Sequence, residues 1–415
     1  MPAVSPRAWM RIAFAMFAVG WGANQFATML IVYRHELRLT AGAVAGLFLV
    51  YALTLIPGLL AGGPASDRFG RRRVVLPFVA LSPLATLLFV LGPHSLAMIT
   101  AGRALGGLCS GVVFGSATAW VQEVSPSDGL SARRSALALT AGFGLGPIVA
   151  AVLAQWAGDP LVVPYLPHLV IGAAAALLLA GVPDPRIPAN PTLPARETAA
   201  RRRHWPPAAV RTARFWLAVA PAGPVVFASV SLAIVVLPEE VTSAGSLSAG
   251  YAGLMTALSF TAGVLVQPLA RRLADPLTGA VAGLVAVTAG AGLGIAAVAA
   301  SGRVLAGAAA VLLGLAYGLC LVSGLRQAEH LAPADQRGAV IACYYAVAYL
   351  GFAAPYLVDG LSALAGQVGA FVLLTTIFAL LTLVTAGYAI TLRRLGAGGP
   401  GYRSAIADSQ PVRDR

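Results

Sequence analysis

The first candidates for chemistry in this sequence are charged side chains that stand inside apolar stretches. Arg103 lies within a long apolar run and is followed by Gly106, Gly107 and Gly111. A charge at the centre of a lipid bilayer costs about 2.5 kcal/mol or more unless it has a partner, so such a residue is a functional candidate. Its guanidinium would contact an acidic substrate group or a proton-relay partner, or would extend outward to the membrane interface. Both interpretations stay open.

Proton coupling requires a titratable group. The acidic residues lie near the ends of the apolar stretches, away from their centres. Asp359 and Glu239 are the acidic candidates for proton coupling. His168 is a further candidate, because histidine titrates near neutral pH.

Neutral polar and aromatic side chains stand deeper in the apolar stretches, at a depth suited to a binding site. Together they would form an aromatic pocket with few charges, which suits an amphipathic or drug-like ligand. The alternative for each is a role in helix packing through interhelical hydrogen bonds. Besides Arg103, the candidates for substrate binding are Trp21, Asn24, Gln25, Ser229, Ser231, Tyr317, Tyr344, Tyr345 and Tyr349.

The residue patterns of several other function classes are missing from the sequence. Cys109, Cys320 and Cys343 have no metal-ligand spacing, and the apolar stretches hold no cluster of His, Asp and Glu, so we expect neither an enzyme nor a metal site. The sequence has no G-x-x-x-x-G-K-[ST] loop for ATP, and we expect no cofactor. Its arginines lie between apolar stretches, so a basic face for nucleic acid is not expected.

The elements that would position these residues are membrane helices. Of the 415 residues, 58% are hydrophobic and 10% are charged, against about 25% charged residues in soluble proteins. A helix needs about 20 apolar residues to cross a bilayer. The first apolar run continues to Tyr33, which is too long for a signal peptide, so we expect a retained span. The twelve predicted spans are 9–33, 41–64, 74–92, 95–121, 132–157, 163–182, 213–237, 248–270, 278–300, 303–325, 338–361 and 367–392.

A stretch rich in proline and arginine divides these spans into two sets of six. It covers residues 183–212 and predicts a cytoplasmic linker. The linker would join an N-terminal six-helix bundle, 1–182, to a C-terminal six-helix bundle, 213–392, and a polar tail would follow at 393–415. The sequence therefore predicts an all-α integral membrane protein.

The two halves resemble each other weakly. Glu123 at the end of one span precedes Arg133 and Arg134, and Glu329 at the end of the equivalent span precedes Arg337. We expect ion pairs within each of these groups, worth at most about 1 kcal/mol where they are exposed. Related halves also predict a binding site between them.

The distribution of arginine predicts the orientation in the membrane. With the N-terminus placed in the cytoplasm, 24 of the 28 arginines fall inside, and only Arg34, Arg38 and Arg303 fall in outer loops. Cytoplasmic loops carry the excess of basic residues. Both termini are therefore expected in the cytoplasm.

The loop after the span 41–64 carries charges in a fixed pattern. It runs GPASDRFGRRR from Gly63 to Arg73. This pattern resembles the signature loop of the major facilitator superfamily, G-x-x-x-D-[RK]-x-G-[RK]-[RK], in its residues and in its place. The resemblance implies a twelve-helix transporter with a central cavity between two six-helix bundles.

The chemistry of this loop predicts a latch between the bundles. Asp67 would pair with an arginine or with the N-terminus of another helix. Gly63 would let a neighbouring helix approach, and Gly70 would supply a turn with positive φ. The alternative is that the arginines only fix topology. The equivalent loop of the second half has Arg271 in place of the aspartate. The predicted latch residues are Gly63, Asp67, Arg68, Gly70 and Arg71.

The span 132–157 contains GFGLGP, in which the key residues are Gly142, Gly146 and Pro147. It resembles the G-x-x-x-G-P core found in the exporting branch of the superfamily. The longer pattern is incomplete, with Arg133 and Ala150 at positions where glycine is expected. A helix kink without bearing on direction is the alternative.

These observations predict secondary active transport of a small organic molecule across a bacterial plasma membrane. Export of a drug or metabolite by a monomer, coupled to a proton or another ion, is the leading hypothesis. The alternatives are an uptake symporter for an organic acid or sugar, favoured by Arg103, and a non-transporting membrane sensor.

Overall fold

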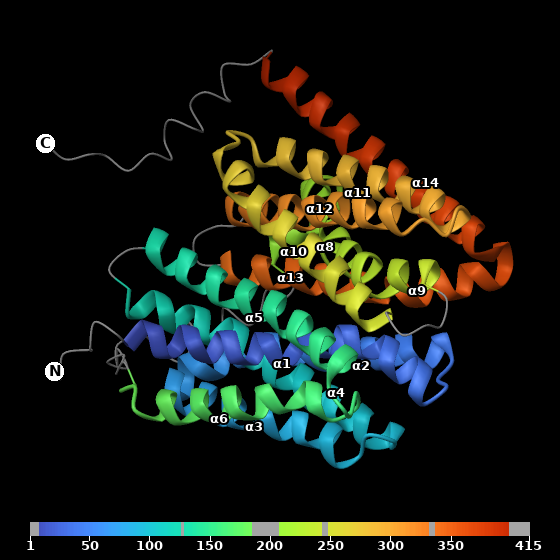
Figure 1. Ribbon diagram of the computed structural model, residues 1–415. Helices are drawn as coiled ribbons and strands as arrows, with labels where there is room; N and C mark the ends of the chain where they lie inside the picture. The colour runs from blue at the N-terminus through green and yellow to red at the C-terminus, as the bar shows by residue number, and fades with distance from the viewer. Residues whose placement is uncertain (1–7, 126–127, 185–206, 243–247, 332–336, 398–415) are drawn as a thin grey trace, which may run out of the picture.

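The computed structural model describes residues 8–125, 128–184, 207–242, 248–331 and 337–397. Within these ranges all regular structure is helical. The predicted all-α fold is confirmed, and its helices lie in two neighbouring groups (Figure 1).

The first group contains the helices of the N-terminal half. The contact between α2 and α4 and that between α1 and α5 are the most extensive, and α3 packs against α4 and α6. The helices are α1 (Ala8–Glu36), α2 (Ala41–Phe69), α3 (Arg71–Leu91), α4 (Leu96–Glu123), α5 (Asp128–Trp156), the 3₁₀ turn η1 (Val163–Tyr165) and α6 (Leu166–Ala180).

The second group begins with a span that changes helix type along its length. Two π-helical turns, η3 (Phe215–Val219) and η4 (Leu232–Val236), flank α8 (Ala222–Ser231), and α9 (Leu237–Val241) follows. Each π turn ends two residues before a proline, Pro221 or Pro238. Proline removes a helix hydrogen bond and crowds the preceding turn, which accounts for the widening there.

The remaining helices of the second group are regular except near the end. They are α10 (Ser248–Arg272), α11 (Pro276–Ala299), α12 (Arg303–Leu331), α13 (Arg337–Tyr349), η5 (Leu350–Ala353) and α14 (Ala354–Ala397). Eleven stretches of the described chain are long and apolar enough to cross a membrane. The last of them is 52 residues long and is broken at Gly366, where φ is 71°. Counting it as two gives the twelve spans that the sequence predicts.

The two ends of the helix bundle differ in how the halves meet. The start of α1, the end of α14 and the α2–α3 connection lie at one end, which we call the terminal end (Figure 1). At the other, distal end, Arg34 of α1 forms an ion pair with Glu239 of α9. The backbone N–H of Gly250 on α10 donates to Oε1 of Gln155 on α5 at 2.9 Å. These four residues, the distal gate, join the two halves.

Candidate functional site

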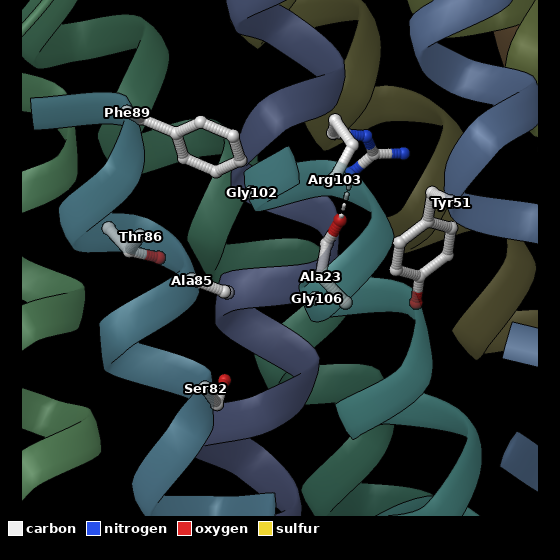
Figure 2. Close-up of a pocket in the computed structure, with 10 residues that line it drawn as sticks. Ala23, Tyr51, Ser82, Ala85, Thr86, Phe89, Gly102, Arg103 and Gly106 are labelled. Atoms are coloured by element: carbon white, nitrogen blue, oxygen red, sulfur yellow. Dashed lines mark hydrogen bonds between the residues drawn. The ribbon is translucent and has the colours of Figure 1, made fainter. Parts of the chain in front are cut away.

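Arg103 is buried inside the first half, with 3% of its surface exposed. Its Nε donates to the Leu47 carbonyl at 3.1 Å. Its Nη1 donates to the Ala23 carbonyl at 3.3 Å (Figure 2). The guanidinium also lies over the rings of Phe26 and Tyr51, 4.4 and 4.3 Å from their centroids. Carbonyl dipoles and aromatic faces therefore stabilise the cation. The side chain turns towards α1 and α2 and does not extend to an interface.

Glycines on α4 allow α4 to pack closely against α2, which places Arg103 within reach of the α2 backbone. A Cβ at Gly107 would overlap the backbone of Tyr51, and one at Gly111 would overlap the backbone of Leu55. The backbones of α2 and α4 therefore approach closely, which brings Arg103 against the α2 carbonyl row.

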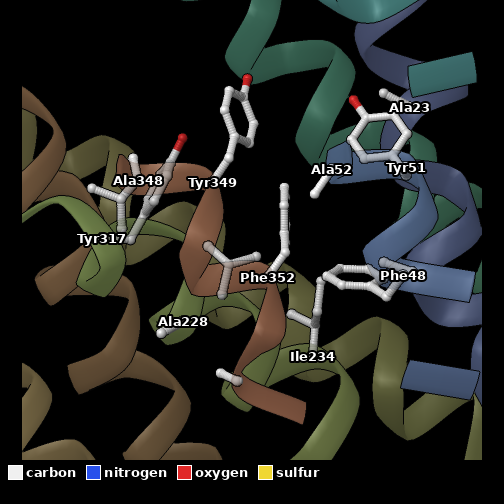
Figure 3. Packing of buried hydrophobic residues seen from close by; sticks show 14 of the residues in the cluster. Ala23, Phe48, Tyr51, Ala52, Ala228, Ile234, Tyr317, Ala348, Tyr349 and Phe352 are labelled. Carbon is white, nitrogen blue, oxygen red and sulfur yellow. The ribbon is translucent and has the colours of Figure 1, made fainter. Parts of the chain in front are cut away.

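A small cavity lies between the two halves, beside Arg103. Phe227 stacks on Tyr349 and Phe352 with centroid distances of 4.6 and 4.4 Å. Phe352 meets Phe48 of α2 edge-on at 4.8 Å (Figure 3). We call it the aromatic cavity, and its lining residues are Ala23, Asn24, Phe48, Tyr51, Arg103, Phe143, Phe227, Tyr349 and Phe352.

The aromatic cavity draws on both halves, as the sequence predicts for a binding site. Arg103, Asn24 and Tyr349 are its members among the predicted candidates. A second small cavity on the other side of Arg103 includes Ser82, Thr86 and Gly106 (Figure 2). Arg103 lines both cavities. The aromatic residues of α2, α5, α8 and η5 were missed, although each stands near the middle of a predicted span.

The predicted polar residues of α1 are already engaged in helix contacts. Asn24 Nδ2 donates to the Phe143 carbonyl of α5 at 2.7 Å. Gln25 Nε2 donates to Thr86 Oγ1 at 3.2 Å, on the side of α3. Trp21 packs on Gly146, where an added Cβ would lie 2.7 Å from the Trp21 carbonyl oxygen. The two glycines of the α5 motif thus serve close contact with α1.

Among the candidates of the second half, Tyr349 lines the aromatic cavity and the others do not. Ser229 is fully buried and donates to the Val225 carbonyl of its own helix at 2.6 Å. Tyr317 packs edge-on against Phe260 with centroids 5.7 Å apart. Tyr345 reaches the cavity through Tyr349, at a centroid distance of 6.3 Å. The Ser231 hydroxyl has no described hydrogen-bond partner. The Tyr344 hydroxyl donates to the Cys320 carbonyl.

The loop at the terminal end holds a charge network within the first half. Gly70 has φ 99°, which confirms the predicted positive φ. Arg71 donates from Nε and Nη2 to Glu123 Oε1 at 2.9 and 2.8 Å, and from Nη1 to Ser66 Oγ at 2.5 Å. Arg68 is exposed and lies over the Phe69 ring at 5.2 Å. The side chain of Asp67 lies outside the described residues.

One expectation about this region was wrong. Glu123 pairs with Arg71 instead of Arg134, because the start of α3 lies beside the end of α4. Arg134 lies over the Trp9 ring at 4.0 Å and donates to Ser125 Oγ. The side chains of Arg133 and Arg337, and hence the expected Glu329–Arg337 pair, lie outside the described residues.

The predicted close helix approach occurs one residue earlier than expected. A Cβ at Gly63 would meet no atom within 4 Å, whereas one at Gly62 would lie 2.8 Å from Cα of Val112. The face of α2 that meets α4 therefore contains Gly62, and Gly63 points away from α4.

The proton-coupling candidates fall into two places. Glu239 belongs to the distal gate, and Oε2 of its neighbour Glu240 is buried without a described hydrogen-bond partner. Asp359 lies near the start of α2, where a Cβ at Gly42 would lie 3.7 Å from its Oδ2. His168 is buried within the first half, with Nδ1 2.7 Å from Thr86 Oγ1.

Two groups of apolar helices around an interfacial cavity define the class of the protein as a polytopic helical membrane protein. The chain belongs to the Major Facilitator Superfamily, whose family model matches residues 12–354. The matched region includes the loop from Gly63 to Arg73, whose pattern resembles the signature loop of this family.

Among curated relatives, the chain is 25% identical over 144 residues to the quinolone resistance protein NorA of Staphylococcus aureus. That match covers 34% of this chain and 37% of NorA. It is 33% identical over 181 residues to the multidrug efflux pump LfrA of Mycolicibacterium smegmatis, covering 40% of this chain and 35% of LfrA. The chain thus spans about a third of the length of these relatives.

Solved structures match over most of the chain. A crystal structure of a mutant of the nucleoside transporter NupG has a TM-score of 0.70 at 12% identity, covering 92% of this chain and 99% of that one. A POT family transporter has a TM-score of 0.69 at 13% identity, covering 93% and 96%. At these identities the likeness shows the fold.

Proposed function

We propose that this transporter exports small aromatic organic molecules across a bacterial plasma membrane by alternating access. The observation that carries the proposal is the aromatic cavity, which both halves line and in which Arg103 supplies a cation. Aromatic walls with one charged group bind planar, amphipathic molecules well. A site shared by the halves can be exposed to either side by rocking one half against the other.

Two observations support export as the direction. The glycines of the α5 motif bring α5 against α1, as the resemblance to exporting members implies. The partial matches to NorA and LfrA, which are named for drug resistance and efflux, point the same way.

We propose that the terminal end faces the cytoplasm. The arginine asymmetry supports this orientation, because Arg71, Arg72, Arg271, Arg272 and Arg394 all belong to helix ends there. Labelling of single cysteines in intact cells tests it. A cysteine at Glu36 should react with an impermeant maleimide, and one at Arg202 should not; the reverse pattern would refute the orientation.

We propose that Glu240 holds a proton when the distal gate is closed. Glu239 already pairs with Arg34, and closure buries Glu240 Oε2 without a described partner. A carboxylate buried in this way is costly, whereas a protonated carboxyl is not. Protons from the outside would then favour closure after substrate release. Replacing Glu240 by glutamine should weaken the dependence of transport on the pH outside the cell; unchanged dependence would contradict this assignment.

Inside-out membrane vesicles test the main proposal. With an imposed pH gradient, they should accumulate a fluorescent aromatic dye, and vesicles with Phe352→Ala should accumulate much less. Equal accumulation by vesicles without the protein would contradict export of such molecules.

Uptake of an organic anion is the second candidate. Its support is that the described polar partners of Arg103 are carbonyl oxygens, so the guanidinium retains its charge for an anionic ligand. Uptake of a labelled aromatic carboxylate into right-side-out vesicles, and none into inside-out vesicles, would favour it over export.

A further inference from the structure

Pro147 leaves a hydrogen-bonding gap in the middle of α5. In a regular helix the N–H of residue 147 would donate to the carbonyl of Phe143, but proline has no N–H. Asn24 of α1 fills this gap, because its Nδ2 donates to the Phe143 carbonyl at 2.7 Å. Asn24 is 7% exposed, so water has little access to the site.

A second residue of α1 binds α5 at Pro147 itself, and a proline inside a helix bends it. Thr28 lies one helical turn after Asn24 and therefore on the same face of α1. Its Oγ1 lies 3.1 Å from the Pro147 carbonyl oxygen and 3.3 Å from the Gln25 carbonyl oxygen of its own helix, so its single proton has the Pro147 carbonyl as the nearer acceptor. Gly142 and Gly146 let the two backbones approach closely at Trp21. The contact thus combines close backbone packing with two directed hydrogen bonds.

The part of α5 that follows Pro147 contacts the second half. Gln155 accepts the backbone N–H of Gly250 at 2.9 Å. A Cβ at Gly253 would lie 2.6 Å from the Cβ of Ala151, so α5 and α10 are in tight contact there. The direction of α5 after Pro147 decides whether this contact forms.

We propose that Asn24 and Thr28 are positioning residues that hold the bend of α5 and thereby aim its distal half at α10. Asn24 satisfies the one carbonyl that Pro147 leaves without a helical donor, Thr28 adds a bond to the carbonyl of Pro147 itself, and together they fix the bend angle. The consequence is closure of the distal gate. This inference depends on the alternating-access part of the proposed function, but its tests do not require a substrate.

A double-mutant cycle with Pro147→Ala tests the hydrogen-bond assignment. Asn24→Ala leaves the Phe143 carbonyl unpaired in a buried place, and we expect the Tm of the purified full chain to fall by about 1–3 °C. Pro147→Ala restores a backbone N–H that can donate to the same carbonyl. In that background Asn24→Ala should change Tm much less. An equal loss of Tm in both backgrounds, or no loss in either, would overturn the proposal.

Cross-linking at the distal end tests the positioning role. Gln155→Cys and Gly250→Cys form the reporter pair, in a chain whose native cysteines are replaced by alanine. A Cβ at Gly250 lies 3.4 Å from Cγ of Gln155, within reach of a disulfide. Asn24→Ala and Thr28→Val should each slow disulfide formation by about fivefold, because the closed gate becomes less populated.

Thr375→Val is the matched control for Thr28→Val. The Thr375 hydroxyl donates to the Phe371 carbonyl of its own helix, away from α5. Thr375→Val should leave the rate of disulfide formation between the two reporter cysteines unchanged. A lower Tm with an unchanged cross-linking rate for both Asn24→Ala and Thr28→Val would show a purely structural role and refute positioning.

Discussion

The two halves of this transporter use arginine in different ways. In the first half, Arg103 donates from two different nitrogens to carbonyls on two different helices. In the second half, Arg326 of α12 donates from a single nitrogen, Nη1, to the carbonyls of Ala270 and Leu273 at the end of α10, at 3.0 and 2.9 Å. The first arrangement needs a planar fork, whereas the second needs only a positive charge near a helix C-terminus.

The loops at the terminal end differ in the same sense. In the first half, the Arg71 side chain is 9% exposed and links the start of α3 to Glu123 and Ser66. In the second half, Asp275 caps α11 and pairs with Arg393, whose side chain is 62% exposed. The comparison teaches that, among these described charge contacts, those of the first half are buried and those of the second half are more exposed.

The largest expected effect follows from replacing Arg103. Arg103→Ala removes two hydrogen bonds from a charged donor, each worth about 1.5–3 kcal/mol, and transport should fall by about a hundredfold or more. Arg103→Lys should recover little, since an ammonium cannot serve both helices. Arg326→Lys should keep most activity, because one nitrogen suffices. Dye accumulation in inside-out vesicles at equal protein level measures both. Equal tolerance of lysine at the two positions would break the comparison.

A smaller effect is expected from Glu123. Glu123→Gln removes the charge opposite Arg71, a half-buried contact, and should lower the transport rate by about tenfold. Asp275→Asn, in the exposed pair of the second half, should change the rate by no more than about twofold. The same vesicle assay, with expression checked by blotting, compares the two. A larger loss for Asp275→Asn would reverse our ranking of the halves.

Asp67→Asn extends this comparison to the predicted latch. Asparagine keeps the size of the side chain but loses the charge needed for a charge-assisted bond. Transport should fall while membrane insertion stays normal. If the Asp67→Asn variant transports at the wild-type rate at equal protein level, Asp67 has no role in the predicted latch.

The smallest effect is expected at the distal gate. Glu239→Gln weakens the ion pair with Arg34, and both side chains are partly exposed, at 23% and 37%. Partly exposed pairs contribute little, so transport should change by about threefold or less. Labelling of a cysteine at Phe48, beside the aromatic cavity, should nevertheless become faster from the outside. An unchanged labelling rate would show that the pair does not restrain the gate.

Much of the fold could be predicted from the sequence. The twelve spans follow from apolar length, and the positive φ at Gly70 follows from glycine after a helix end. Span boundaries near Gly366 were also predicted. Long apolar runs and glycine conformations are local properties, so tertiary contacts do not change them.

The contacts within the site could be predicted only in part. Arg103 and Asn24 were recognised from their polarity, but the use of Asn24 at the Pro147 kink depends on which face of α1 meets α5. Gly62 rather than Gly63 faces α4 for the same kind of reason. The pairing of Glu123 with Arg71 joins residues 52 positions apart, which sequence proximity does not reveal. Helix rotation and long-range packing decide these contacts.

A reversible lock on the distal gate tests the central claim, alternating access between the halves, most directly. Transport is measured in a cysteine-free chain that carries Gln155→Cys and Gly250→Cys, first after oxidation and then after reduction. The account predicts that the disulfide stops transport and that reduction restores it, with either single cysteine unaffected by oxidation. Full transport by the cross-linked protein would contradict it, because the halves would then not need to separate at the distal end.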